Sequence, residues 1–244
     1  MDSCLIYTAG NTAALQLAAQ QLKQAGCRFI LTPDHNVTHL LLPVPSLDAN
    51  GCIKGGGKLE DLLQQLPRNV RVIGGNLPAL DRQTYDLLQD PEYVAENAYI
   101  TAHCAVRLVM DRLPTALRGC KVLVIGWGRI GKCLAALLKG LEACVTVAAR
   151  KESDRAMLRA LGYGTVSTDD LPADNYRVIL NTAPVMVLPH CPEKCLKIDL
   201  ASQTGLGGND VLWARGLPGK DAPEASGELI ARTVLKYLKK ERSA

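Results

Sequence analysis

Three glycines near the middle of the chain have the spacing of a turn that binds the pyrophosphate of a dinucleotide. Gly126, Gly128 and Gly131 follow an aliphatic run at 120–125 and precede an apolar repeat typical of a helix. In such a turn the first glycine permits a sharp bend, the second admits the phosphates, and the third lets helix and strand pack closely, with the helix N-terminus facing the phosphates. The alternative is a strand-to-helix turn that binds no nucleotide. The predicted cofactor-facing segment is Gly126, Trp127, Gly128, Arg129, Ile130 and Gly131.

The residue that selects between the two nicotinamide dinucleotides is expected at the end of the next strand. About 20 positions after the glycines, an acid would bind the ribose of NAD, whereas an arginine accommodates the 2′-phosphate of NADP. The predicted strand at 144–149 ends in Arg150 and Lys151, and the hydroxyl of Ser153 follows closely. We therefore expect NADP as the cofactor, with Arg150 on the phosphate or the adenine. The alternative is that Arg150 and Lys151 are only solvent-exposed charges at the end of a strand.

The elements that must position this turn alternate between strands and helices, which favours an α/β fold with parallel sheets. We predict a Rossmann doubly wound parallel sheet and a second, smaller N-terminal α/β domain. The predicted boundaries are 1–92 for the small domain, 93–117 for an inter-domain helix, 118–219 for the Rossmann NADP-binding domain, and 220–244 for a C-terminal helix that packs back toward the N-terminal domain. The predicted strands lie at 4–9, 27–31, 38–45, 69–75, 120–125, 144–149, 164–167, 176–181, 196–201 and 210–214.

Composition and charge exclude several classes of function. A hydrophobic content of 48% supports buried cores, and the net charge of +4 comes from scattered Lys and Arg, so no nucleic-acid partner is expected. No apolar stretch is long enough for a membrane span, and no secretory signal is expected. The nine cysteines lie mostly in apolar runs without a C-x-x-C pair, which predicts reduced core residues in a cytoplasmic protein.

Histidines and cysteines show two patterns that could suggest a metal site. His35 and His39 have helical spacing, but a proline precedes them and no third ligand is evident. His190, Cys191 and Cys195 lack a fourth ligand and lie in a proline-rich turn. No metal site is expected.

Several loops beyond the glycine turn carry a resemblance to a known family. The matching motifs include Val-Thr-Val-Ala-Ala-Arg-Lys at 145–151, Asn-Thr-Ala-Pro at 181–184 and Ile-Asp-Leu-Ala-Ser at 198–202. The segment 216–227 also matches, as do 72–77 and 100–102. Together these segments closely resemble the family of the A subunit of dipicolinate synthase, from about residue 72 to about residue 237. This combination is far more specific than the glycine fingerprint alone.

The resemblance implies a fold, a reaction and a partner. It implies a Rossmann NADP-binding domain beside a smaller α/β domain, in a layout similar to D-2-hydroxyacid and alanine dehydrogenases. It also implies oxidation of dihydrodipicolinate, a small dicarboxylate, in the cytoplasm of the mother cell of a sporulating bacterium. The implied partner is the flavoprotein-like B subunit of dipicolinate synthase, and a homo-oligomer is a further possibility. The chain departs from the family at 101–104, where His103 replaces an acid, and at 202–208.

Oxidation of such a substrate needs a hydride acceptor, cations for two carboxylates and at most a weak base. The expected catalytic residues are His103 as acid or base, Lys220 on a substrate carboxylate, and Ser202. Ser202 and Asn181 either fix the nicotinamide ribose and amide or cap their loops. Equally, Lys220 could be a plain surface cation and His103 a packed residue. The residues expected at the nicotinamide end are Asn181, Thr182, Ala183, Pro184, Ala201 and Ser202.

Two other functions compete with this interpretation. An NADP-dependent 2-hydroxyacid dehydrogenase would need a substrate-binding arginine after the fifth Rossmann strand, where this chain has Ser202 and Gln203. A nucleotide-binding regulatory protein without turnover would explain the short first domain and the altered segment at 101–104. Substrate turnover distinguishes the three hypotheses.

Overall fold

The computed structural model describes residues 4–243 and divides into two compact units. The first contains the chain up to Asn97 and again from Pro218 onward, and the second contains Ala98–Leu217. The predicted domain boundaries also include residues 1–3 and 244, which lie outside the described residues. The long helix α3, Pro91–Arg112, contributes residues to both units.

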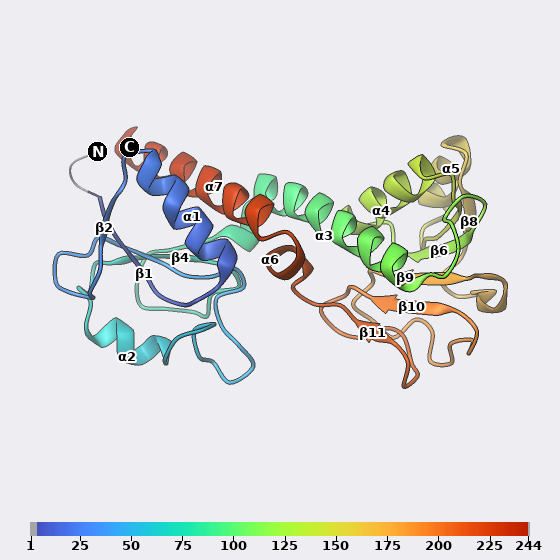
Figure 1. Ribbon diagram of the computed structural model, residues 1–244, viewed down its shortest axis with the longest axis horizontal. Coiled ribbons are helices and arrows are strands. Elements are labelled where there is room, and N and C mark those ends of the chain that lie inside the picture. Colours follow the sequence, from blue (N-terminus) through green and yellow to red (C-terminus); the bar gives the residue numbers. More distant parts are fainter. Residues whose placement is uncertain (1–3, 244) are drawn as a thin grey trace. The chain divides into compact units, whose positions relative to one another are not determined.

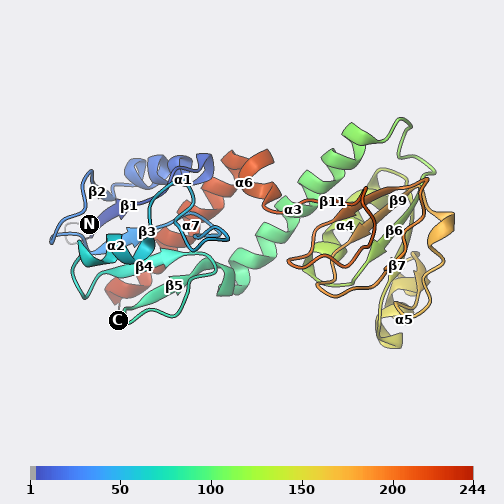
Figure 2. The same ribbon diagram turned by 90° about the horizontal axis from the view of Figure 1, so that it is seen from below.

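The first unit is built on a parallel sheet of five strands in the order β2-β1-β3-β4-β5. Figure 1 shows α1 and α7 on one side of this sheet and α2 on the other. The strand β5 was not predicted, because its three residues contain no aliphatic run and it lies at the sheet edge beyond β4 (Figure 2). The elements of this unit are β1 Leu5–Thr8, α1 Ala13–Gln24, β2 Arg28–Ile30, β3 His39–Leu41, α2 Leu59–Gln64, β4 Arg71–Gly74, β5 Thr84–Asp86, η1 Leu87–Gln89 and α7 Pro223–Ser243.

The last helix, α7, packs against α1. Thr12 begins α1 by accepting a hydrogen bond from the amide of Leu15 at 3.3 Å. The two helices approach closely at Gly227, where a Cβ atom would lie 2.8 Å from Leu17 Cβ and 2.9 Å from the carbonyl oxygen of Ala14. The first unit is therefore assembled from both ends of the chain.

Aromatic and acidic side chains link α7 to the sheet of this unit. The hydroxyl of Tyr85 donates to Asp90 at 2.6 Å, and its ring stacks on Tyr237 at a centroid distance of 4.2 Å. Tyr237 in turn donates to Glu241 at 2.5 Å, and Glu241 also lies 3.0 Å from His39 Nε2. His39 is thus engaged within this unit. The cluster connects α7 to β3 and β5.

We expect Tyr85→Phe to destabilise the first unit in a pH-dependent way. The hydrogen bond from Tyr85 holds the pKa of the Asp90 carboxyl below its usual value. A depressed pKa contributes stability above the unfolded-state value, and that contribution is lost as the pH falls through the folded-state value. Urea unfolding should show a loss of about 1 kcal/mol at pH 7 that shrinks below about pH 4. Tyr7→Phe is the control, and a loss that is independent of pH would contradict the prediction.

The second unit is a parallel sheet of six strands in the order β11-β10-β9-β6-β7-β8. This is the strand order of the Rossmann fold, and the order reverses between β6 and β9. The predicted fold is therefore confirmed. The elements, α3 aside, are β6 Lys121–Ile125, α4 Arg129–Gly140, β7 Cys144–Ala148, α5 Glu152–Ala160, β8 Gly164–Val166, η2 Ala173–Asn175, β9 Val178–Asn181, β10 Leu196–Asp199 and β11 Leu212–Trp213. The short helix α6, Leu217–Asp221, begins with the last residue of this unit and continues in the first unit.

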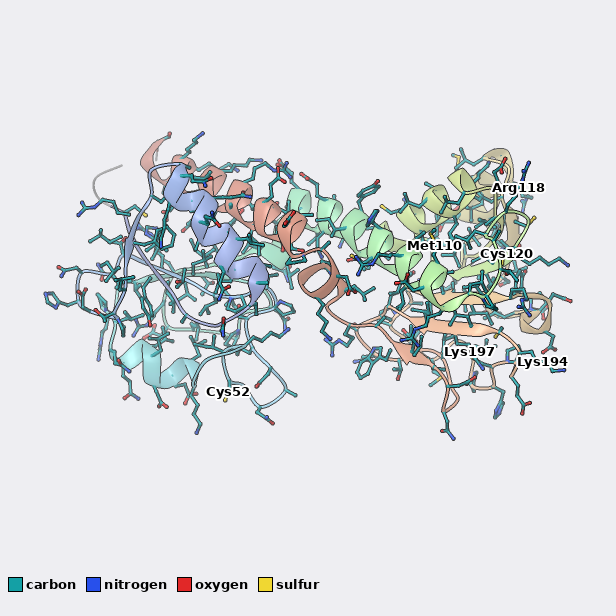
Figure 3. The ribbon with its side chains drawn as sticks, viewed as in Figure 1. Cys52, Met110, Arg118, Cys120, Lys194 and Lys197 are labelled. Atoms are coloured by element: carbon teal, nitrogen blue, oxygen red, sulfur yellow. The ribbon has the colours of Figure 1, made fainter. Side chains whose placement is uncertain are left out.

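One face of the second sheet carries irregular segments. Leu123 and Ile125 of β6 pack there with Leu188 and Leu206, which come from loops. Below these loops lies Lys197 of β10, only 2% exposed, labelled in Figure 3. Its ammonium group donates to the carbonyl of Pro192 at 2.7 Å and pairs with Asp210 at 2.5 Å. Because a buried cation needs such partners, these contacts hold two loops to the sheet.

The cysteines differ in burial from what the sequence predicts. None of the nine, all of which lie within the described residues, forms a disulfide. Cys144, expected in the core, is exposed because it is the first residue of β7 and faces outward there. Within the described residues, no three His, Cys, Asp or Glu side chains gather closely enough to hold a metal ion. Across residues 4–243, no helix combines the length and apolar character needed to cross a membrane.

Candidate functional site

The glycine turn follows β6 at the point where the strand order reverses. Gly126 has a φ of +103°, which L side chains rarely adopt, and a Cβ there would lie 2.5 Å from Thr182 Oγ1. Thr182 holds the turn from the neighbouring strand, because its amide and its hydroxyl both donate to the carbonyl of Ile125 at 2.9 Å. A Cβ at Gly131 would lie 2.1 Å from the carbonyl oxygen of Gly126. The first and third glycines are thus required by packing.

The N-terminus of α4 fits an anion such as a pyrophosphate. Gly128 is the N-cap and provides no side-chain hydrogen bond, and a Cβ at this position would meet nothing within 4 Å. The first amides of α4 therefore keep their donors for a ligand, and the first turn contains no acid. Arg129 is exposed in this turn, whereas Ile130 is half-buried. These features match what the phosphates of a dinucleotide require.

The indole of Trp127 packs against other side chains of the same unit. Its ring meets Tyr163 edge-on at a centroid distance of 6.1 Å, and Lys132 Nζ lies 5.7 Å from the ring centroid. Trp127 can therefore contribute to the predicted cofactor segment through its backbone.

The end of β7 presents cations on the same side of the sheet as the glycine turn. This side, where the carboxyl ends of the strands lie, is called the nucleotide edge below. Arg150, Lys151 and Ser153 are all exposed there, directly before and within the first turn of α5. Arg155, which the sequence analysis missed, donates to the carbonyls of Ala149 and Arg150 at 2.6 and 2.8 Å. The backbone at Arg150 is thereby held by a side chain from the first turns of α5.

The acid nearest to Arg150 in the sequence is Glu152, and its carboxylate already has hydrogen-bond partners. Glu152 accepts hydrogen bonds from Arg159 at 2.7 Å and from Arg155 at 2.9 Å. The hydrogen bond from Arg159, followed by that from Arg155, lowers the pKa of the Glu152 carboxyl. This carboxylate is thus paired with two arginines of its own helix, α5.

The ends of β9 and β10 form the other half of the edge. Asn181 is fully buried, and its amide nitrogen donates to the carbonyl of Ala183 at 2.9 Å and to Asp199 at 3.0 Å. Its amide oxygen accepts from the backbone of Ala183 at 3.0 Å. The polar atoms of the Asn181 side chain are therefore bonded to the turn that follows it and to β10, which is the geometry expected of a loop cap.

The exposed residues of this half lie on two short turns. Thr182 and Ala183 are half-buried and Pro184 is exposed after β9. After β10, Ala201 is buried and its carbonyl accepts from the indole of Trp213 at 3.0 Å, whereas Ser202 is exposed. The hydroxyl of Ser202 is accessible at the carboxyl edge of the sheet.

The two remaining catalytic candidates lie elsewhere. His103 is exposed on α3 and lines a groove of about 500 Å³ with Met110 and with the second half of α4, from Ala136 to Leu141. The glycine turn is at the beginning of α4, so within this unit His103 is not brought to the nucleotide edge. Helical periodicity in the sequence does not reveal which neighbour a helix faces, and the expected role of His103 as acid or base stays a prediction. Lys220 is exposed in α6 and belongs to the first unit.

Comparison with known proteins assigns the kind of domain. Residues 92–186 match the family of the D-isomer specific 2-hydroxyacid dehydrogenase, NAD binding domain. This match covers the glycine turn, the end of β7 and the turn after β9. The second unit is therefore a nicotinamide dinucleotide-binding domain.

Most of the chain is similar in sequence to the A subunit of dipicolinate synthase. The A subunit of dipicolinate synthase from Bacillus subtilis is 26% identical over 243 residues, which cover 87% of this chain and 81% of that protein. The crystal structure of the same type of chain from Bacillus subtilis superposes with a TM-score of 0.84 at 22% identity and covers 100% of this chain and 98% of that chain. The corresponding structure from Bacillus halodurans gives a TM-score of 0.83 at 20% identity, with 97% and 98% covered. At these identities the structures establish the fold.

The resemblance suggested by the loop motifs is thus confirmed in sequence and in fold. The glycine turn, the half of the sheet that carries it and the matching family all indicate a nicotinamide dinucleotide as the ligand. This chain resembles the A subunit of dipicolinate synthase across both units, and its second unit is a nicotinamide dinucleotide-binding domain of the oxidoreductase type.

Proposed function

We propose that this chain is an NADP-dependent oxidoreductase that converts dihydrodipicolinate to dipicolinate, the product for which the proteins it resembles are named. The observation that carries the proposal is the pairing of a dinucleotide edge with Arg150 where an NAD site has an acid. The similarity to the A subunit of dipicolinate synthase over 87% of the chain supports the choice of substrate. The substrate is a small dicarboxylate.

The residues of the edge have distinct roles in this proposal. The first amides of α4, with Arg129, hold the pyrophosphate, and Arg150, Lys151 and Ser153 hold the 2′-phosphate. When bound, NADP supplies the acceptor for a hydride from the dihydropyridine ring. Because the product is aromatic, the protein needs mainly to orient the ring and exclude water. The segments that border the nicotinamide are Thr182, Ala183 and Pro184 after β9, and Ala201 and Ser202 after β10.

The substrate carboxylates need cationic partners, and Lys220 is the proposed one. Its ammonium group is exposed at the end of the short helix α6. Ser202 is the proposed hydrogen-bonding group beside the nicotinamide. His103 has no assigned role in this proposal, because it lines the groove beside the second half of α4.

The proposal extends to a partner and a setting. Similarity to an A subunit supports assembly with the B subunit of dipicolinate synthase, in the cytoplasm of the mother cell of a sporulating bacterium. A homo-oligomer of this chain is also part of the proposal. No membrane or nucleic-acid partner is proposed.

The reaction can be tested directly by absorbance. NADP and freshly generated dihydrodipicolinate are mixed with the protein, with and without the B subunit, and the absorbance of the reduced nicotinamide is followed. We expect NADPH to form in proportion to enzyme. Tight NADP binding without reduction under either condition would favour the regulatory alternative, and reduction by a 2-hydroxy acid instead would favour the dehydrogenase suggested by the match at 92–186.

A further inference from the structure

A buried carboxylate lies directly beneath the nicotinamide half of the nucleotide edge. Asp199 is the last residue of β10 and is fully buried, although charged residues are rarely found in such positions without compensating partners. The dehydrogenase reaction described above assigns it no role. Its surroundings show what it does in the fold.

Asp199 accepts four hydrogen bonds. Oδ1 accepts from the amide of Ala201 at 3.0 Å, and Oδ2 accepts from the amides of Gly205 and Leu206 at 2.7 and 3.1 Å. The fourth donor is Asn181 Nδ2 at 3.0 Å, from the adjacent strand. All four partners are N–H groups, which is the pattern that a carboxylate with two accepting oxygens satisfies.

These bonds fix both ends of the turn at 201–206. Between the anchored amides lie three consecutive exposed residues, Ser202, Gln203 and Thr204. The turn is also packed from below, because a Cβ at Gly205 would lie 2.3 Å from the carbonyl oxygen of Val185 and 2.6 Å from Asn181 Nδ2. Val185 belongs to the turn after β9. Asp199 therefore joins the turns after both strands into one rigid surface.

The strand order determines which part of the cofactor this surface would face. A dinucleotide lies across the point where the order reverses, so its two halves lie over opposite halves of the sheet. The glycine turn and Arg150 belong to β6 and β7, which is the adenosine half. The surface held by Asp199 belongs to β9 and β10, which is the nicotinamide half.

We propose that Asp199 is a positioning residue for the nicotinamide half of the cofactor, acting through the turns after β9 and β10. The proposal rests on the proposed use of NADP and deepens it. Asp199 touches neither cofactor nor substrate. It sets the place of Ser202 and of the backbone at Ala183, so its removal should weaken the binding of the nicotinamide half and leave the adenosine half unchanged.

The test compares two probes that share the adenosine half. NADPH contains both halves, whereas 2′,5′-ADP contains only the adenosine half with its 2′-phosphate. For Asp199→Asn we expect the Kd of NADPH to rise about tenfold, because one anchoring amide faces a donor in place of an acceptor. The Kd of 2′,5′-ADP should stay within about twofold of wild type.

A matched control makes the same chemical change elsewhere in the unit. Asp169→Asn alters an exposed carboxylate that contacts only Ser167 in the described contacts, at 3.3 Å, and should change neither Kd. Equal loss of both probes in Asp199→Asn would indicate general destabilisation and overturn the proposal, as would no change in either. A wild type that binds 2′,5′-ADP and NADPH no better than background would instead refute the proposed function.

A measurement on wild type keeps the proposal testable if the variant does not fold. Without nucleotide, the amides of Gly205 and Leu206 should exchange with deuterium at least about tenfold more slowly than those of 202–204. Exchange of these amides at the rate of the exposed residues would show that the turn is not held in advance, and would overturn the proposal.

Discussion

Arg150→Asp is expected to reverse the cofactor preference of the second unit. The substitution removes the cation at the end of β7 and places an acid where an NAD site has one. The loss of charge-assisted hydrogen bonds and the new repulsion should raise the Kd of NADP by about 100-fold. Binding of NAD should stay within about threefold of wild type or improve. Both dinucleotides are titrated into both proteins by calorimetry.

The control for this prediction is Arg118→Asp. Arg118 is 79% exposed and precedes β6 at the amino end of the strand, where Figure 3 labels it, and pairs with Glu142 at 3.0 Å. It changes the net charge of the protein by the same amount, so it reports any long-range effect of charge alone. Should wild type bind NAD more tightly than NADP, the assignment of Arg150 is wrong.

Gly131→Ala is expected to have the largest effect on the stability of the second unit. The added methyl group would lie 2.1 Å from the carbonyl oxygen of Gly126, a backbone atom that cannot move without opening the turn. Overpacking of this kind should lower the free energy of unfolding by about 2–3 kcal/mol. Since the N-terminus of α4 must shift, binding of NADP and NAD should weaken together.

The matched substitution in the same helix is Gly140→Ala. A Cβ there meets nothing within 4 Å, so the gain in helix propensity should stabilise the unit by about 0.5–1 kcal/mol. Both tryptophans of the chain, Trp127 and Trp213, lie in the second unit, so their fluorescence during urea unfolding reports on this unit. Equal stabilities for the two variants would contradict the packing role of Gly131.

The nucleotide half of the site could be predicted because its determinants are local in sequence. A strand, three spaced glycines and a helix specify their own turn, and Arg150 ends the next strand. The parallel sheet of this unit was predicted from the alternation of strands and helices, and its strand order is that of the predicted Rossmann fold. The first sheet was also foreseen apart from β5, which lacks an apolar pattern.

The residues that support the site could not be predicted in the same way. Asp199 resembles an ordinary strand end in the sequence, since its partners at Gly205 and Leu206 meet it only after the turn has folded. The role of Arg155 depends on carbonyls that only the start of α5 brings within reach. For Lys197, a strand position alone does not reveal that loops cover it. In each case the deciding contact is tertiary.

The packing of α7 on α1 has a consequence for the order in which the chain can fold during synthesis. All strands of the first sheet leave the ribosome early, but the side of α1 that packs on α7 stays uncovered until residues 223–243 emerge. The complete second unit is made in between, and domains generally fold as units as they emerge. The nucleotide-binding unit is therefore complete before its host unit can close, and a released chain truncated after residue 217 should bind nucleotide although α1 lacks its helical partner.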